Sequence, residues 1–293
     1  MNIQKSFAKD SKGSLYIVPT PIGNLDDITL RALNTLKSSS IIAAEDTRNT
    51  QKLLNHFEIN SSLISYHEHN KQKRGQEILE RLKKGEQVSL VSDAGMPAIS
   101  DPGFELIQTS IQADHPVVVL PGANAALCAL IGSGLSTKEF LFYGFLPRKK
   151  TEKKAELERL HPLKSTIIFY ESPYRLKETL EVIFEQLGDR QITIARELTK
   201  RFEEYLRGKV SEVLNWFKEN KPRGEYCLVV SGNEEYRTLE NTLWWGHLSV
   251  IDHVNHYIKS EHLSNKDSIK RVATERQMAK REVYRMFHMS END

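Results

Sequence analysis

Several features are scarce in this sequence, and each absence excludes a class of protein. Cys128 and Cys227 are the only cysteines in 293 residues, which leaves no disulfide framework and no cysteine spacing for zinc. Lys and Arg number 41 against 39 Asp and Glu, and a net charge of +2 is far from that of a protein that coats nucleic acid. Charges interrupt every apolar run, which excludes an integral-membrane class. With 39% hydrophobic residues, the chain predicts a soluble globular protein with a sizeable core.

The N-terminal residues 1–13 are polar and lack the apolar stretch and cleavage site of a secretory signal. We therefore expect them to form a flexible extension rather than a targeting segment. The scarcity of cysteine favours a reducing compartment, so the predicted location is the cytoplasm.

Short apolar runs alternate with longer amphipathic stretches from residue 15 onward, a rhythm typical of an α/β fold. The pattern predicts a first group of buried strands at residues 15–18, 41–44, 88–91 and 117–120, and a second group at 140–144, 166–170, 191–195 and 225–230. Amphipathic helices are expected at residues 29–37, 47–57 and 74–84, since apolar side chains recur there every three or four positions. We predict two α/β domains, residues 14–120 and 121–235, the first built on a mostly parallel sheet.

The last part of the chain, residues 244–293, reads as helical throughout and predicts an appendage. A short break there separates two apolar sets, as in two packed helices joined by a turn. The sets are Ile269, Val272 and Ala273 on one side, and Val283, Tyr284 and Phe287 on the other. Residues 247–293 hold eight Lys or Arg against seven acids. That balance leaves both a packing role and nucleic-acid binding open.

Polar residues follow two of the expected strands directly. The first strand runs into a tight proline-containing loop at residues 19–29, whose acidic end argues against a bound phosphate. The second ends in Glu45-Asp46-Thr47-Arg48, at the position where open α/β sheets bind ligands. For the first loop we favour an ordinary turn in which Asp caps the helix, whereas for the second segment helix capping and surface pairing explain the residues as well as a site does. The nearby His-x-His of residues 65–70 has no convergent further ligand, so we predict no metal site.

The segment SDAGMPAISDPG, residues 92–103, is the densest signal in the sequence. It follows an expected strand and combines two Asp, two Gly and two Pro with small side chains. Such a loop lets backbone approach a flat ligand while carboxylates reach hydroxyl groups. A second small-residue loop, PGANAA at residues 121–126, also follows a strand. Loops of this kind at one sheet edge favour a nucleoside-like cofactor.

Seven motifs together resemble one known group of proteins, the RNA-directed branch of the tetrapyrrole-methylase fold family, whose members are class III methyltransferases. They are VPTPIGNLDDIT, AAEDTRNTQKLL, SYHEHN, SDAGMPAISDPG, LPGANA, FYESPYRL and ARELTK. The resemblance covers roughly residues 14–232. It implies two α/β domains with S-adenosylmethionine in the cleft between them, and 2′-O-methylation of a cytidine ribose in the decoding region of small-subunit ribosomal RNA. The implied partners are the small ribosomal subunit or its RNA and a second copy of the chain, with no membrane.

The resemblance also assigns site residues by motif. The implied donor-binding residues are Pro21, Asp93, Gly95, Met96, Ala98, Ile99, Asn124, Ala125 and Tyr170. For the transfer we hypothesise that Asp46 accepts the hydroxyl proton, Arg48 holds phosphate and Glu197 is the second candidate base. Basic clusters at residues 71–74, 148–154 and 196–201 could hold RNA backbone, or could be solvated helix faces.

Two other functions stay open. The first is a methyltransferase of the same fold that acts on a tetrapyrrole carbon, although the Glu45–Arg48 segment, the His loop and the basic clusters speak against it. The second is a regulator that senses a nucleoside and binds DNA through its C-terminal helices. Deleting the C-terminal helices would distinguish a regulator from an enzyme. A regulator would lose all nucleic-acid binding, whereas an enzyme should keep its affinity for the donor.

Overall fold

The computed structural model describes residues 3–6, 13–233 and 244–289. Contacts within the chain divide it into two compact units, residues 1–232 and 233–293, and each is described here by itself. Both expected α/β domains, apart from residues 233–235, belong to the first unit, so their boundary at residue 120 stays a prediction. Most of the expected extension 1–13 lies outside the described residues. Within the described part, no helix is long and apolar enough to cross a membrane.

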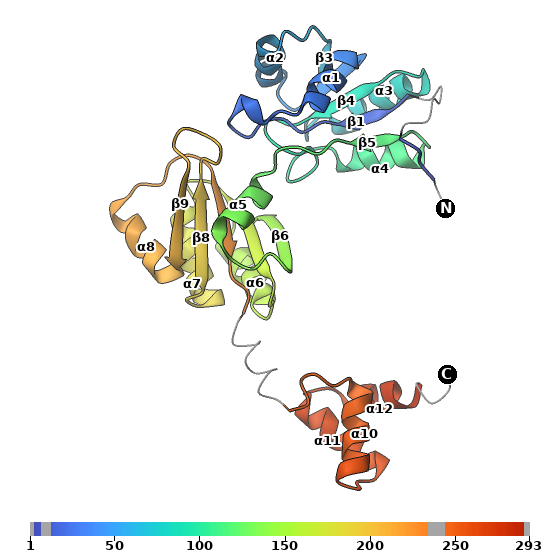
Figure 1. The fold of residues 1–293 in the computed structure, drawn as a ribbon, viewed down its shortest axis with the longest axis vertical. Helices are drawn as coiled ribbons and strands as arrows, with labels where there is room; N and C mark the ends of the chain where they lie inside the picture. The colour runs from blue at the N-terminus through green and yellow to red at the C-terminus, as the bar shows by residue number, and fades with distance from the viewer. Residues whose placement is uncertain (1–2, 7–12, 234–243, 290–293) are drawn as a thin grey trace. The chain divides into compact units, whose positions relative to one another are not determined.

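The first sheet of unit 1 is parallel throughout, as predicted, in the order β3-β2-β4-β1-β5 (Figure 1). Its strands are β1 (Leu15–Ile17), β2 (Ile41–Ala44), β3 (Leu63–Ser65), β4 (Val88–Val91) and β5 (Val117–Val119). The connecting helices are η1 (Leu25–Asp27), α1 (Leu30–Ser38), α2 (Thr47–His56), α3 (Lys71–Lys83) and α4 (Phe104–Gln112). Sequence patterns missed β3, because this three-residue edge strand is only partly buried.

Alternation of side chains along the strands divides the core of this sheet in two. Ile41 and Ala43 of β2 pack with α3 and α4, whereas Ile42 and Ala44 pack with α1 and α2. Helices therefore cover both faces, and β2 and β4 are buried at every position. For these two central strands, only the strand ends and the loops beyond them are left open to a ligand.

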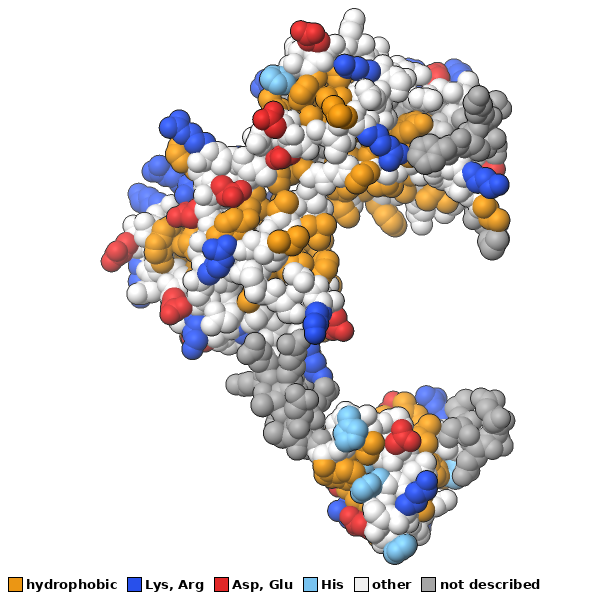
Figure 2. Space-filling view, in the orientation of Figure 1, with side chains coloured by type: hydrophobic (Ala, Val, Ile, Leu, Met, Phe, Trp, Pro, Cys, Tyr) orange, Lys and Arg blue, Asp and Glu red, His pale blue; other side chains and the backbone are white. Residues whose placement is uncertain are grey.

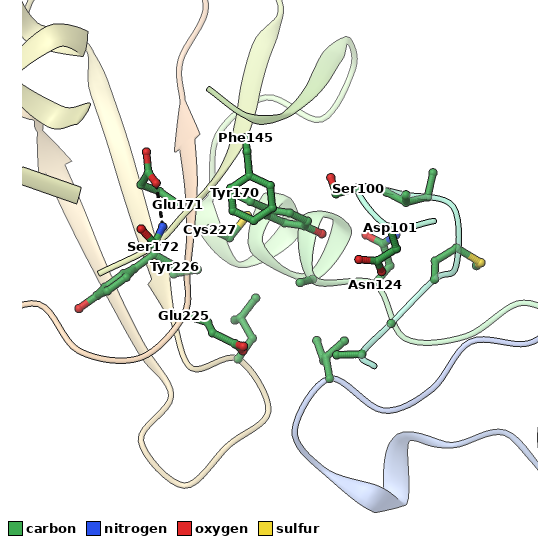
Figure 3. A pocket seen from close by; sticks show the side chains of 18 of the residues that line it. Ser100, Asp101, Asn124, Phe145, Tyr170, Glu171, Ser172, Glu225, Tyr226 and Cys227 are labelled. Carbon is green, nitrogen blue, oxygen red and sulfur yellow. Dashed lines mark hydrogen bonds between the residues drawn. The ribbon is translucent and has the colours of Figure 1, made fainter. Parts of the chain in front are cut away.

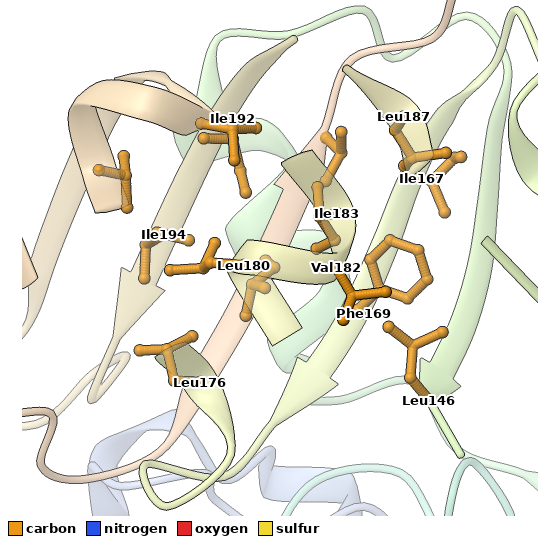
Figure 4. Close-up of a cluster of buried hydrophobic side chains, with 14 of the residues drawn as sticks. Leu146, Ile167, Phe169, Leu176, Leu180, Val182, Ile183, Leu187, Ile192 and Ile194 are labelled. Carbon is orange, nitrogen blue, oxygen red and sulfur yellow. The ribbon is translucent and has the colours of Figure 1, made fainter. Parts of the chain in front are cut away.

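The second sheet of unit 1 is mixed, in the order β6-β7-β10-β8-β9, with β6 and β7 parallel and the other pairs antiparallel. Its strands are β6 (Phe140–Phe145), β7 (Thr166–Glu171), β8 (Gln191–Arg196), β9 (Glu204–Lys209) and β10 (Tyr226–Val230). The helices are α5 (Ala125–Ser133), α6 (Lys150–Leu160), α7 (Leu176–Leu187) and α8 (Val210–Glu219). One face packs against α6, α7 and α8 in the largest apolar cluster (Figure 4), and α5 packs on the other face. The apolar pattern did not predict β9, because it is a largely polar edge strand.

The C-terminal unit contains α10 (Val250–Ser260), α11 (Asn265–Glu275) and α12 (Lys280–Met289). The predicted packing of α11 against α12 is confirmed for Ile269, Val272, Ala273, Val283 and Phe287, which share a cluster with Val254 and Tyr257 of α10. The prediction was wrong for Tyr284, whose surface is 55% exposed. Position 284 lies on the outer side of α12, since the helix turns Val283 and Phe287 inward.

Candidate active site

Two loops at the strand ends of the first sheet are bonded to each other. Thr20, beyond β1, exchanges two backbone hydrogen bonds of 3.0 Å with Gly95, beyond β4. The Thr20 hydroxyl also donates to the carbonyl of Ser92 at 3.1 Å. The segment 92–103 is thereby held against its neighbour at the carboxyl edge of the sheet.

The backbone of this loop takes conformations that side chains disfavour. Ala98 and Ser100 have φ of +67° and +63°, in the left-handed region that costs a residue with a Cβ energy. Gly95, with φ of +80°, lies where a Cβ would approach the Ile22 side chain to 3.2 Å. Strain of this kind persists where surrounding contacts enforce it, and it concentrates at functional sites.

Beside this loop lies a cavity of about 330 Å³, shown in Figure 3. Its walls come from the loops of the first sheet and from the strand ends of the second. The first group is Ile22, Ala94, Gly95, Met96, Ile99, Ser100, Asp101, Asn124 and Ala125. The second group is Phe145, Tyr170, Glu171, Ser172, Pro173, Ala195, Leu198, Glu225, Tyr226 and Cys227. Its volume falls within the range of roughly 300–1,000 Å³ that is typical of small-molecule sites.

The polar part of this lining is acidic. Asp101, Glu171 and Glu225 contribute carboxyl groups, whereas the described residues that line the cavity include no Lys, Arg or His. Glu171 is fully buried, pairs with Arg175 at 3.3 Å and accepts hydrogen bonds from the Thr179 hydroxyl at 2.6 Å and the Ser172 amide at 2.8 Å. Glu225 pairs with Lys200 at 2.8 Å, which leaves Asp101 as the carboxyl of this lining without a cation partner among the described residues. The cavity therefore suits a ligand with apolar rings and hydrogen-bonding groups, and it offers a phosphate no cation in its lining.

Asp101 differs from an ordinary surface carboxyl. Burial raises its pKa to about 7, and the charges of Glu45 and Asp93 act in the same direction against a hydrogen bond from Ser92. Glu45 is itself raised in pKa by burial and by Asp93. Figure 3 shows Asp101 and the Tyr170 hydroxyl pointing toward one another across the cavity. Asp101 can thus take up a proton near neutral pH at the wall of the cavity.

The expected donor-binding residues divide between two hollows. Six of them line the main cavity: Gly95, Met96, Ile99, Asn124, Ala125 and Tyr170. Pro21 and Asp93 line a neighbouring hollow together with Asn49, Lys52 and His56. Ala98 lines neither of these hollows. The donor contacts of all nine residues stay predictions, and so does the side of the site that each one serves.

The three expected catalytic residues lie outside the cavity lining. Asp46 caps α2, and its carboxylate binds the Arg48 guanidinium at 2.6 and 3.0 Å. Hydrogen bonds from Arg48 lower the pKa of Asp46 to about 2. Burial raises the pKa of Glu197, but hydrogen bonds from the Glu225 amide and the Lys200 ammonium outweigh it, so the pKa is lowered. Both carboxylates are weak proton acceptors as they stand.

Asp101, Glu225 and Cys227 are cavity residues that sequence reasoning missed. Asp101 stands in the second half of the quoted segment 92–103, so its motif was visible although the residue was not singled out. Glu225 and Cys227 lack a local signal, because the antiparallel pairing of β10 with β7 and β8 brings them to the cavity. Among the described residues, no group of three or more His, Cys, Asp or Glu could hold a metal ion.

The three expected basic clusters are largely occupied by acids of the same unit. Lys71 pairs with Glu68 and Glu105, and Lys200 with Glu197 and Glu225. The remaining pairs are Arg74–Glu77, Lys149–Glu152, Lys154–Glu185 and Arg196–Glu204. Lys153 is fully buried, and its ammonium donates to Glu178 and Thr179 at 2.8 and 3.0 Å. These contacts favour a structural role for most of the three clusters.

Comparison with known proteins adds to this geometry. Residues 14–214 match the family model described as Tetrapyrrole (Corrin/Porphyrin) Methylases. The chain is 53% identical to a ribosomal RNA small subunit methyltransferase I of Bacillus subtilis, over 98% of this chain and 99% of that one. It is 52% identical to the protein of the same name from Halalkalibacterium halodurans, with the same coverage. Among solved structures it resembles a cobalt precorrin-4 methyltransferase of cobalamin biosynthesis, with a TM-score of 0.57 and 19% identity over 74% of this chain and 94% of that one. That last likeness concerns the fold alone.

Proposed function

Because this chain belongs to the tetrapyrrole methylase family, and within it to the ribosomal RNA small subunit methyltransferases I, we propose that it methylates small-subunit ribosomal RNA with S-adenosylmethionine as donor. The main support for this donor is the cavity beside residues 92–103, with its acidic and apolar lining. S-adenosylmethionine combines a flat heterocycle, ribose hydroxyls, a sulfonium and an ammonium group. The lining offers a surface for each of these.

The residues of the cavity divide naturally among the parts of that ligand. Met96, Ile99 and Tyr170 offer apolar surface for the ring, and the glycine at position 95 lets backbone come close. Carboxylates such as Asp101 complement positive charge and ribose hydroxyls. When bound, S-adenosylmethionine supplies a methyl group made electrophilic by its sulfonium. We place Pro21 and Asp93, which face the neighbouring hollow, on the acceptor side instead.

For the acceptor we propose the 2′-hydroxyl of a cytidine ribose in the decoding region, as the motifs imply. That oxygen is a weak nucleophile, and it must lose its proton as it gains the methyl group. Asp101 is best suited to take this proton, because it lines the cavity and has a pKa of about 7. Asp46 is bound to the exposed guanidinium of Arg48, so we assign this pair to RNA contacts and retain Asp46 as the competing base. Glu197, held by Lys200, is the weakest of the three candidates.

The test is transfer of labelled methyl to small ribosomal subunits and, separately, to naked RNA, followed by mapping of alkali-resistant positions. We expect one cytidine to carry the label in its 2′-O position. Modification on a base instead of a ribose would contradict the finer assignment and leave the family membership intact. Labelling of a tetrapyrrole acceptor with none of the RNA would replace the proposal by the alternative activity of this fold.

We further propose that the protein acts as a homodimer in the cytoplasm. Large apolar side chains are exposed on α4, β5, α5 and β6, and Figure 2 shows apolar side chains gathered along one side of this unit. They include Phe104, Val119, Ile131 and Phe145, which are 53–75% exposed. Exposed apolar surface of this kind is typical of protein interfaces. Light scattering should give twice the mass of the chain, and Ile131→Lys should lower it; a wild-type monomer would contradict the proposal.

A further inference from the structure

Helix α12 of the C-terminal unit presents a row of exposed cations. Its buried side chains, Val283 and Phe287, face the core. Lys280 and Tyr284 are four residues apart, and Arg281 and Arg285 form the neighbouring row, so the four share one side of the helix. All four are exposed. We call these four residues the α12 basic face.

Most acids among the described residues 244–289 have partners away from this face. Four of the five acidic side chains there are engaged elsewhere. Asp252 and Asp267 accept hydrogen bonds at 2.6 and 2.5 Å from the serines that cap α10 and α11. Glu261 and Glu275 both hold Arg271, at 2.6 and 3.2 Å. These four acids therefore lie on or next to α10 and α11, whereas the α12 basic face carries cations.

On α12 itself, three cations stand beside one acid, Glu282, which leaves a net charge of +2 on ten residues (3 − 1). Within the described part of the chain, none of Lys280, Arg281 and Arg285 forms an ion pair or a side-chain hydrogen bond. The basic clusters of unit 1 are mostly paired with acids, so this face is unlike them. An exposed Tyr284 stands among the cations and leans on the His288 ring, with the ring centroids 4.3 Å apart.

We propose that the α12 basic face binds the ribosomal RNA substrate, with its cations on phosphates and Tyr284 against an unstacked base. This inference rests on the proposed function for the choice of RNA. Cations contribute the salt-dependent part of such binding, and an exposed aromatic ring stacks on single-stranded bases. The four-residue turn 276–279, in which Gln277 takes a left-handed φ of +52°, sets α12 against α11 in a helix-turn-helix arrangement. Of the two roles that the sequence left open for the C-terminal unit, packing and nucleic-acid binding, this proposal takes the second.

The experiment compares two triple variants of the full chain that remove the same charge from different helices. The test variant carries Lys280→Gln, Arg281→Gln and Arg285→Gln. The matched control carries Lys259→Gln, Lys266→Gln and Lys270→Gln, which are likewise exposed, on α10 and α11. Affinity for a small-subunit RNA fragment is measured across a series of salt concentrations, together with S-adenosylmethionine binding and methyl transfer.

We expect the test variant to bind RNA at least ~10-fold more weakly. The slope of log affinity against log salt should fall by about 2–3, or roughly one for each phosphate that the variant no longer binds. Its KM for RNA should rise while donor binding stays at the wild-type value. Equal losses in both triple variants would overturn the assignment to α12, since they would reflect net charge alone. Tighter binding of duplex DNA through the same face would overturn the choice of RNA and favour the regulator.

Failure of this inference can be told apart from failure of the proposed function. If the wild-type protein methylates RNA and the test variant keeps its KM, the inference fails and the function stands. If no RNA is methylated but only the test variant loses affinity, the inference stands and the function fails. Tyr284→Ala gives a second test, because an exposed ring can be removed without loss of the core. We expect the RNA affinity of Tyr284→Ala to fall ~5-fold or more, with an unchanged dependence on salt. If this variant bound RNA as tightly as the wild-type protein, Tyr284 would not stack on a base.

Discussion

Asp46 and Asp101 lie in loops that follow neighbouring strands of one parallel sheet, β2 and β4, yet their surroundings give them opposite chemistry. Asp46 is half-buried and bound by Arg48, which lowers its pKa to about 2. Asp101 is partly buried at the cavity wall beside Glu45 and Asp93, and its pKa rises to about 7. A strand-end position is therefore insufficient to identify a base. Burial and neighbouring charge decide which carboxylate can accept a proton at neutral pH.

The largest expected effect comes from removing the carboxylate of Asp101. Asp101→Asn should lower the single-turnover rate of methyl transfer by about 10²- to 10⁴-fold at saturating donor and RNA, because a positioned proton acceptor contributes an acceleration of that order. Quenched-flow measurement with labelled donor gives the rate. A rate within threefold of wild type would show that Asp101 is not the proton acceptor and would leave Asp46 as the candidate.

The same substitution should stabilise the fold at high pH. The raised pKa means that folded Asp101 keeps a proton between about pH 4 and pH 7 that the unfolded chain has released. The contribution of Asp101 to the free energy of unfolding therefore falls as pH rises through this window and is lowest above it. We expect Asp101→Asn to raise the free energy of unfolding at pH 8 by ~1–2 kcal/mol, after allowance for screening of a partly exposed group. Urea unfolding at pH 8 and at pH 4 measures this difference, which should vanish at the lower pH.

A smaller effect is expected when only the neighbouring charge is removed. Glu45→Gln takes away a carboxylate that helps to raise the pKa of Asp101, while burial, the larger cause, is retained. The acid limb of the rate profile should move to lower pH with little change in the maximum rate. Single-turnover rates between pH 5 and pH 9 show the shift, and a shift to higher pH would contradict the account.

The smallest effect is expected from removing the charge of Asp46. Asp46→Asn removes the charge that faces Arg48 but keeps a side chain that caps α2 well. The single-turnover rate at saturating RNA should stay within about tenfold of wild type, with any loss in the KM for RNA. A loss of rate equal to that of Asp101→Asn would reverse the two assignments.

Much of the fold follows from apolar patterning, and the exceptions have a physical cause. The buried strands β2 and β4 were predictable, since every side chain along them enters the core. The edge strands β3 and β9 were not, because they are only partly buried and resemble loops in sequence. Tyr284 looked like a core residue at helical spacing, but the side of α12 that faces the core carries Val283 and Phe287 and leaves Tyr284 outside.

The site was only partly predictable for a similar reason. The glycines, prolines and aspartates of segment 92–103 predict a ligand-binding loop, but the sequence does not show which carboxyl group becomes buried. That depends on the pairing of this loop with Thr20 and on the second sheet, whose Glu225 and Cys227 arrive through long-range contacts. The ion pair of Glu261 with Arg271 in the C-terminal unit likewise depends on helix packing, and a count of charges does not show it.

The most direct test of the central claim is the pH dependence of single-turnover methyl transfer in the wild-type enzyme and in Asp101→Asn. If Asp101 is the proton acceptor, the wild-type rate rises with pH as its carboxyl ionises, with a midpoint at about 7. The variant should be slow and should lack this rise. The same rise and midpoint in both proteins would contradict the account and place the base elsewhere.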